Sequence, residues 1–138
     1  MFSPDGRWIA YASNEAGRYD IYVRPFPDPG GKWRISTGDG TFPHWSATAH
    51  ELLFVSQGKV MFAPYTVVSD SFRAEKPQIW SPTGFRDLGT TYPYDLHPDG
   101  KRLAIIAAAD EGEGVAQDKV VFFFGFGDYL KKIAPVRP

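Results

Sequence analysis

The chain of 138 residues contains no cysteine, which excludes disulfide bonds, thiolate metal sites and a cysteine nucleophile. The formal net charge is −1 at pH 7, so the chain has no excess of positive charge to attract a phosphate backbone. Nucleic acid is therefore not an expected partner. Long apolar runs are also missing. The longest, Val120 to Phe124, is too short to span a bilayer, so membrane insertion is not expected. No signal peptide is expected at the first residues, and the sequence does not assign a compartment.

Motifs for catalysis and cofactor binding are missing as well. The sequence has no Gly-x-Ser-x-Gly nucleophile elbow, no phosphate-cradling glycine loop and no Asp-rich calcium loop. Its three histidines, His44, His50 and His97, are too scattered for a metal site, which needs ligands at short, defined spacing. We therefore predict that the chain is not an enzyme and has no catalytic residue, no metal and no cofactor.

The composition nevertheless predicts a folded core made of short strands. Hydrophobic residues make up 43% of the chain and aromatic residues 16%, which is far from the composition of a disordered segment. Fourteen glycines and twelve prolines are spread along the chain and separate short apolar runs. This punctuation is typical of strands joined by turns.

A turn-and-strand pattern recurs three times. Ser3-Pro4-Asp5-Gly6 fits a type I turn and precedes an apolar strand, and Leu96-His97-Pro98-Asp99-Gly100 repeats it. The copies begin at Phe2, Trp45 and Leu96, which lie 43 and 51 residues apart. In these turns, Asp5 and Asp99 are expected to cap their own backbone rather than to bind metal. In the second copy, the expected strands are Glu51–Val55, Val60–Tyr65 and Gln78–Trp80.

A period of 40–50 residues with four short strands per copy is typical of a propeller blade. The run Leu103–Ala108 is apolar on both alternate faces, as in a strand that lies between two neighbouring sheets. We predict an all-β fold, a partial β-propeller of about three four-stranded blades at residues 1–40, 41–84 and 85–138. The helical spacing of Phe126, Tyr129, Leu130 and Ile133 predicts a short C-terminal helix. A two-sheet sandwich is the rival architecture, but it lacks such a repeat.

The segments Ser3–Tyr11, Asp20–Val23 and Leu96–Arg102 resemble the repeats of TolB-like, WD-like propellers. The C-terminal segment Leu130–Pro135 is similar to the end of propellers attached to bacterial serine/threonine kinase-like proteins. The resemblance implies a six-bladed propeller that serves as a sensor or protein-interaction module. The second copy departs from the repeat, because Trp45–Ala49 has neither the proline nor the glycine of the turn.

Four residues are candidates for binding a partner. His44 precedes Trp45 and Asp95 precedes Leu96, so both are expected on innermost strands that face a central channel. The alternative is that they only line the channel as solvated polar side chains. Arg18 and Arg86 are expected in loops on one face, where arginine forms forked hydrogen bonds, the alternative being ordinary surface charge.

The predicted function is a non-enzymatic module of the sensor or scaffold type that binds a protein or peptide. Two alternatives stay open: a propeller fragment of a prolyl-oligopeptidase-like serine peptidase without its hydrolase domain, and a lectin-like module that holds a small ligand in the channel. Because three blades form only an open arc, self-association is also expected. A homodimer would complete a six-bladed ring, whereas a truncated remnant would aggregate.

Overall fold

The computed structural model describes residues 1–27, 30–81, 92–106 and 120–124, and its regular elements there are all β-strands. The strands pair in antiparallel fashion throughout. The prediction of an all-β chain is therefore confirmed for the described residues. The helix predicted from Phe126 to Ile133 lies outside them, and so does Arg86.

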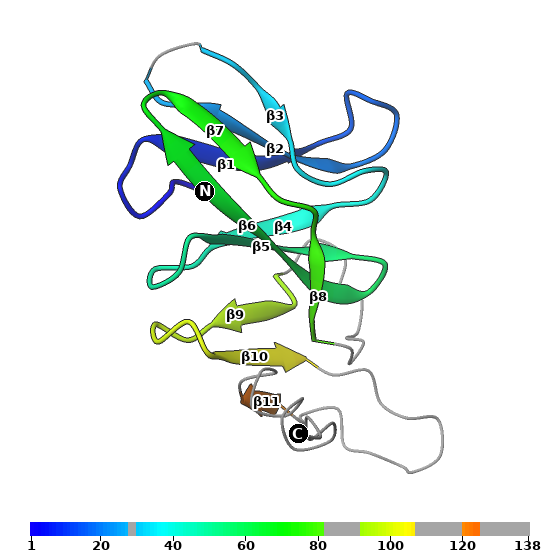
Figure 1. The fold of residues 1–138 in the computed structure, drawn as a ribbon. Coiled ribbons are helices and arrows are strands. Elements are labelled where there is room, and N and C mark those ends of the chain that lie inside the picture. Colours follow the sequence, from blue (N-terminus) through cyan, green and yellow to red (C-terminus); the bar gives the residue numbers. More distant parts are fainter. Residues whose placement is uncertain (28–29, 82–91, 107–119, 125–138) are drawn as a thin grey trace, which may run out of the picture.

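The strands form three sheets in the order of the chain, and Figure 1 shows the sheets stacked one above another. A bridge between Phe2 and Ile9 adds a short inner strand segment to the first sheet. In the second sheet, β8 pairs with β6. The first sheet contains β1 (Trp8–Ser13), β2 (Asp20–Pro25) and β3 (Trp33–Arg34); the second contains β4 (Thr41–Trp45), β5 (Glu51–Ser56), β6 (Lys59–Val68), β7 (Ser71–Ala74) and β8 (Gln78–Ser81); the third contains β9 (Tyr94–Leu96), β10 (Arg102–Ile106) and β11 (Val120–Phe124).

The same turn precedes one strand of each sheet, namely β1, β5 and β10. In every copy, a backbone N–H at the start of the turn donates to the carbonyl five residues later. This shared hydrogen bond shows that the repeat seen in the sequence is also a repeat of local structure. The bond joins Ser3 N to Trp8 O (2.9 Å), Ser46 N to Glu51 O (3.0 Å) and His97 N to Arg102 O (2.9 Å).

Two of these turns use glycine and aspartate, as predicted. Gly6 and Gly100 have φ angles of 70° and 69°, in the left-handed region that glycine adopts without strain. Asp5 accepts the N–H of Arg7 at 3.1 Å, and Asp99 accepts that of Lys101 at 2.9 Å. Both aspartates therefore cap the backbone of their own turn.

The middle turn reaches the same shape with different chemistry. It has neither proline nor glycine, but the hydroxyl of Ser46 accepts the N–H groups of Thr48 and Ala49 at 3.4 Å and 3.1 Å. A serine side chain that bonds to nearby backbone can stabilise a turn in place of special φ angles. This explains how the departure from the repeat is tolerated.

The second sheet is buried on both faces, because alternate residues of β5 and β6 point to different neighbours. Leu52, Phe54 and Ala63 belong to a core shared with the first sheet. Leu53 and Val60 belong to a second core shared with the third sheet. Burying one such large apolar side chain contributes about 1.5–3 kcal/mol, so these two interfaces hold the three sheets together.

A hairpin arm, Tyr65–Ala74, extends from the second sheet onto the first. It consists of the second half of β6 paired with β7, while the first half of β6 pairs with β8. At its tip, the Arg7 guanidinium donates to Ser69 O at 3.0 Å and to the Asp70 carboxylate at 3.1 Å. The sequence pattern predicted the strand Val60–Tyr65 but neither its extension nor β7. The arm accounts for part of the greater length of the second copy.

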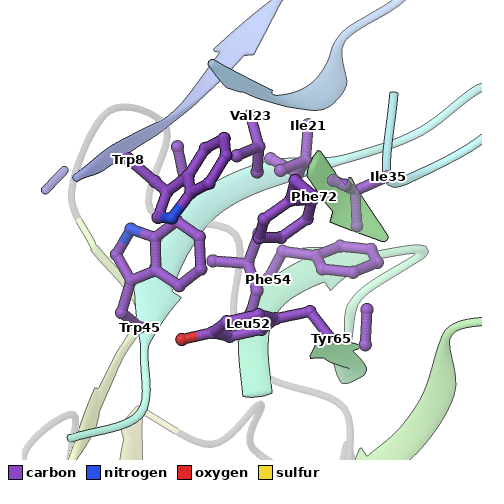
Figure 2. Packing of buried hydrophobic residues seen from close by; sticks show 11 residues of the cluster. Trp8, Ile21, Val23, Ile35, Trp45, Leu52, Phe54, Tyr65 and Phe72 are labelled. Carbon is purple, nitrogen blue, oxygen red and sulfur yellow. The ribbon is translucent and has the colours of Figure 1, made fainter. Parts of the chain in front are cut away.

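The arm places Phe72 at the centre of an aromatic cluster, most of which Figure 2 shows. Phe72 is only 2% exposed, and its ring meets rings from the first sheet and from the rest of the second. Ring centroids lie 5–6 Å apart, in the range at which aromatic pairs attract one another. The partners of Phe72 are Tyr65 at 5.0 Å, Trp8 at 5.3 Å, Trp33 at 6.0 Å and Trp45 at 6.1 Å.

Candidate functional site

The structure places His44 and Asp95 on one open concavity of about 420 Å³. His44 lies on β4 and Asp95 on β9, which are the first strands of the second and third sheets. We call this surface the β4–β9 concavity. Its lining residues are Met1, His44, Tyr92, Pro93, Tyr94, Asp95, Ala104 and Ile105.

A β-bulge shapes the wall on the β4 side. Pairing between β4 and β5 shifts between Thr41 and His44, and Phe42 has a φ of 52°, which is unusual for a bulky residue. Bulges bend a strand and redirect its side chains, so this one sets the direction of His44. The strained backbone of Phe42 is fixed by its contacts: the Tyr94 hydroxyl donates to Phe42 O at 2.8 Å, and the Tyr92 ring lies 5.0 Å from the Phe42 ring.

Burial controls the ionisation of the groups in this wall. Tyr94 is buried, which raises its pKa well above the ordinary value and keeps the phenol protonated as a hydrogen-bond donor. Burial also lowers the pKa of the half-buried His44, although the nearby Asp95 carboxylate acts in the opposite direction. The His44 imidazole is therefore neutral at pH 7.

The exposed Asp95 carboxylate supplies the charge of the concavity. Among the eight residues that line it, Asp95 is the one acidic residue. Within the part of the chain that the structure describes, no hydrogen bond or ion pair engages the side chain of Asp95 or that of His44. Among the described residues, the His44 ring contacts the Tyr94 ring at a centroid distance of 6.1 Å. The concavity combines the Asp95 carboxylate and the Met1 ammonium, which donates to Ala10 O, with a largely apolar lining.

Arg18 lies on a separate concavity of about 530 Å³, which shares no residue with the first. We call it the Arg18 concavity. The carboxylate of Asp39 accepts the Gln57 N–H there at 2.6 Å and is therefore used to fix the loops. Arg18 itself is exposed and makes no ion pair with the described residues. The lining residues are Arg18, Tyr19, Thr37, Gly38, Asp39 and Gln57.

The sequence analysis missed a buried carboxylate beneath this second surface. The Asp20 side chain is fully buried and accepts hydrogen bonds from Ser36 Oγ at 2.8 Å, from Gly38 N at 2.7 Å and from the Arg34 guanidinium. Burial alone would raise the pKa of Asp20, but these hydrogen bonds outweigh it and hold the pKa below its ordinary value. Asp20 therefore anchors the loop that carries Gly38.

Close packing around Asp20 also explains a glycine in this loop. A Cβ atom on Gly40 would lie 2.2 Å from Ser36 Oγ and 3.1 Å from Ile21 Cγ1, so any larger residue would displace the serine. Ser36 Oγ also accepts the Ile21 N–H at 2.9 Å, which links the loop to β2. The run Thr37–Gly40, with its two glycines, is the sequence signal that could have indicated this tight loop.

Neither a metal cluster nor a membrane span is found in the described ranges. No three residues of the types His, Asp and Glu gather there in a way that could hold an ion. The same residues include no helix of the length and apolarity needed to cross a bilayer. A scan of the sequence against models of protein families gives no match, and a search of curated proteins also finds no relative.

Proposed function

We propose that the chain is a non-enzymatic β-propeller module of the sensor or scaffold type, and that it binds a protein or peptide in the β4–β9 concavity. The observation that carries the proposal is the concavity itself, in which the side chains of His44 and Asp95 form no hydrogen bond or ion pair with the described residues and lie beside the rings of Tyr92 and Tyr94. Ligand sites are commonly concave and mostly apolar, with a few polar groups that fix orientation.

The repeated local structure supports the propeller part of the proposal. Three sheets follow one another along the chain, and in each of them the same turn leads into one strand. The second sheet is apolar on both faces, as a blade between two neighbours requires. The resemblance of the turn segments to TolB-like repeats is consistent with this architecture, because propeller blades recur at such a spacing.

The chemistry of the concavity supports binding rather than catalysis. The His44 ring donates no hydrogen bond to a described carboxylate, whereas a catalytic histidine usually donates to such a partner. The groups present can recognise a side chain by charge and shape, which suits a peptide-binding surface.

A selection from a random peptide library displayed on phage tests this proposal. We expect peptides that bind the purified chain saturably and lose at least about tenfold in affinity to Tyr92→Ala, because that ring supplies an exposed aromatic contact. Asp70→Ala, at an exposed site outside the concavity, should bind them as the wild type does. Failure to obtain any saturable binder, or binders indifferent to Tyr92→Ala, would contradict the proposal.

We also propose that a second copy of the chain binds to complete a six-bladed ring, and the exposed aromatic pair of Phe2 and Phe26 supports this proposal. Phe2 and Phe26 form a ring pair with centroids 5.0 Å apart, yet Phe2 stays 54% exposed. Exposed apolar surface of this kind favours association. We expect light scattering of the purified chain at micromolar concentration to give the mass of a dimer, and Phe2→Ser to shift it toward the monomer.

A matched control separates this contact from a general effect of aromatic exposure. Tyr19 is also 54% exposed but lies on the Arg18 concavity, so Tyr19→Ser should leave the mass unchanged. A monomeric wild-type chain with a cooperative thermal transition would show that the described sheets need no second copy.

A further inference from the structure

We infer that the β4–β9 concavity takes a basic side chain of the bound peptide, and arginine in preference to lysine; this inference rests on the proposed function. Four features of the lining lead to it. They are the Asp95 carboxylate, the neutral His44 imidazole, the Tyr94 hydroxyl that already donates to Phe42 O, and the exposed Tyr92 ring.

The charge of the concavity selects against an acidic occupant. Asp95 brings one negative charge, and the neutral His44 brings no compensating positive charge at pH 7. The Met1 ammonium, which also belongs to this part of the chain, is engaged by Ala10 O at 2.7 Å. A carboxylate or phosphate placed here would be repelled by Asp95, and the Met1 ammonium offers it little, because that group already donates to a backbone carbonyl and burial lowers its pKa.

A neutral apolar occupant also fits poorly. It would cover Asp95 and remove water from the carboxylate without giving it a hydrogen-bond donor, which is costly for a charged group. The hydroxyl of Tyr94 cannot serve as that donor, because it donates to Phe42 O. An occupant must therefore bring its own donors to Asp95, and a positive charge makes those hydrogen bonds stronger.

The rest of the lining suits the long stem of a basic side chain. Ala104 gives partly exposed apolar surface beside the fully buried Pro93 and Ile105, and the methylene groups of arginine or lysine can pack against it. The Tyr92 ring is 47% exposed and lies 5.0 Å from the Phe42 ring, so its exposed part can contact a cation. A guanidinium can stack on this ring and also offer two parallel N–H groups to Asp95, which an ammonium cannot do.

Four capped peptides, Ac-Ala-Ala-X-Ala-Ala-NH2 with arginine, lysine, citrulline or glutamate at X, test the inference by titration of the ¹⁵N-labelled chain, and the lysine peptide should bind more weakly than the arginine peptide. Citrulline keeps the shape of arginine without its charge. We expect the arginine peptide to shift the amide signals of His44 and Asp95 saturably. The citrulline peptide should bind at least about tenfold more weakly, and the glutamate peptide should give no shift there.

Two Asp→Asn variants remove the same formal charge at different sites. Asp95→Asn should reduce the affinity for the arginine peptide to that for the citrulline peptide, whereas Asp70→Asn should match the wild type. Equal affinity for arginine and citrulline peptides, or no effect of Asp95→Asn, would overturn the inference. So would phage-selected binders that depend on Tyr92 but contain no basic residue, and this result would leave the proposed function intact.

Discussion

Replacing Phe72 with alanine is expected to lower the free energy of unfolding by about 3–5 kcal/mol, the usual cost of removing a buried phenylalanine from a core. The ring is 2% exposed and touches rings from two sheets, so its loss leaves a cavity that rigid neighbouring tryptophans cannot easily fill. The arm that carries Phe72 would lose its main apolar contact with the first sheet. This loss should weaken the whole interface between the first and second sheets.

Urea denaturation followed by tryptophan fluorescence measures this effect directly, because Trp8, Trp33 and Trp45 lie in the same cluster. Val68→Ala is the matched control, since Val68 lies on the same arm but is 71% exposed, and its loss should cost less than about 0.5 kcal/mol. A change below about 1 kcal/mol for Phe72→Ala would show that the arm contributes little to the core.

Replacing Asp20 with asparagine is expected to cost about 2–4 kcal/mol, because hydrogen bonds to a charged group contribute about 1.5–3 kcal/mol each. Asparagine keeps one acceptor oxygen but turns an NH₂ group toward donors. Ser36 and Gly38 donate to one oxygen of Asp20 and Arg34 to the other, so asparagine would lose either the Arg34 bond or both of the other two, and the bonds that remain would be made to a neutral group. The loop that carries Gly38 and lines the Arg18 concavity should loosen as a result.

The same substitution should change the pH dependence of stability. The folded-state pKa of Asp20 lies below its ordinary value of 3.8, so its contribution is complete above that pH and is lost as the pH falls through the folded-state pKa. The wild type should therefore lose more stability than Asp20→Asn on acidification below about pH 4. Asp5 and Asp99, whose pKa values are also lowered, are present in both proteins and cancel in the comparison.

Urea denaturation at a series of pH values gives both quantities, with Asp70→Asn as a control that removes an exposed carboxylate. Parallel curves for the wild type and Asp20→Asn would contradict the assignment of Asp20 as an ionised anchor. Equal stability at neutral pH would contradict the expected cost of the substitution.

The recurring turns could be predicted from sequence because their chemistry is local. Gly6 and Gly100 follow a proline and an aspartate at fixed offsets, and each turn closes within a few residues. The apolar run at Leu103 indicated a buried strand for the same reason, and Leu103 and Ile105 do lie in the core shared with the second sheet. Local patterns of this kind were sufficient for the all-β class.

Features that depend on distant partners could not be predicted in this way. The strand β7 has one large apolar residue, Phe72, and is stabilised by its contact with another sheet rather than by its own pattern. Asp20 is buried because Ser36 and Gly38, far along the chain, donate to it. An isolated aspartate at the start of a strand gives no sign of such partners.

In the candidate site, too, some features follow from local sequence patterns and others depend on contacts between distant residues. Equivalent places in the repeat predicted that His44 and Asp95 would lie on first strands, and the structure places both on one concavity. No pattern of neighbouring residues indicated that Phe42 would adopt a positive φ or that Tyr92 and Tyr94 would contact it. A left-handed phenylalanine is unfavourable locally and persists only where surrounding contacts fix it.

The double pairing of β6 has a consequence for the accuracy of folding. Strands such as β5, which are apolar on both faces, can slide by one residue along a partner without exposing a core side to water, so hydrophobicity alone leaves their alignment open. Here β6 pairs with β8 at its first half and with β7 at its second half. A shift of β6 by one residue would remove Phe72 from its contacts with the aromatic cluster and would also disrupt the pairing with β8. These two separate contacts therefore exclude misaligned pairings that the apolar pattern alone would permit.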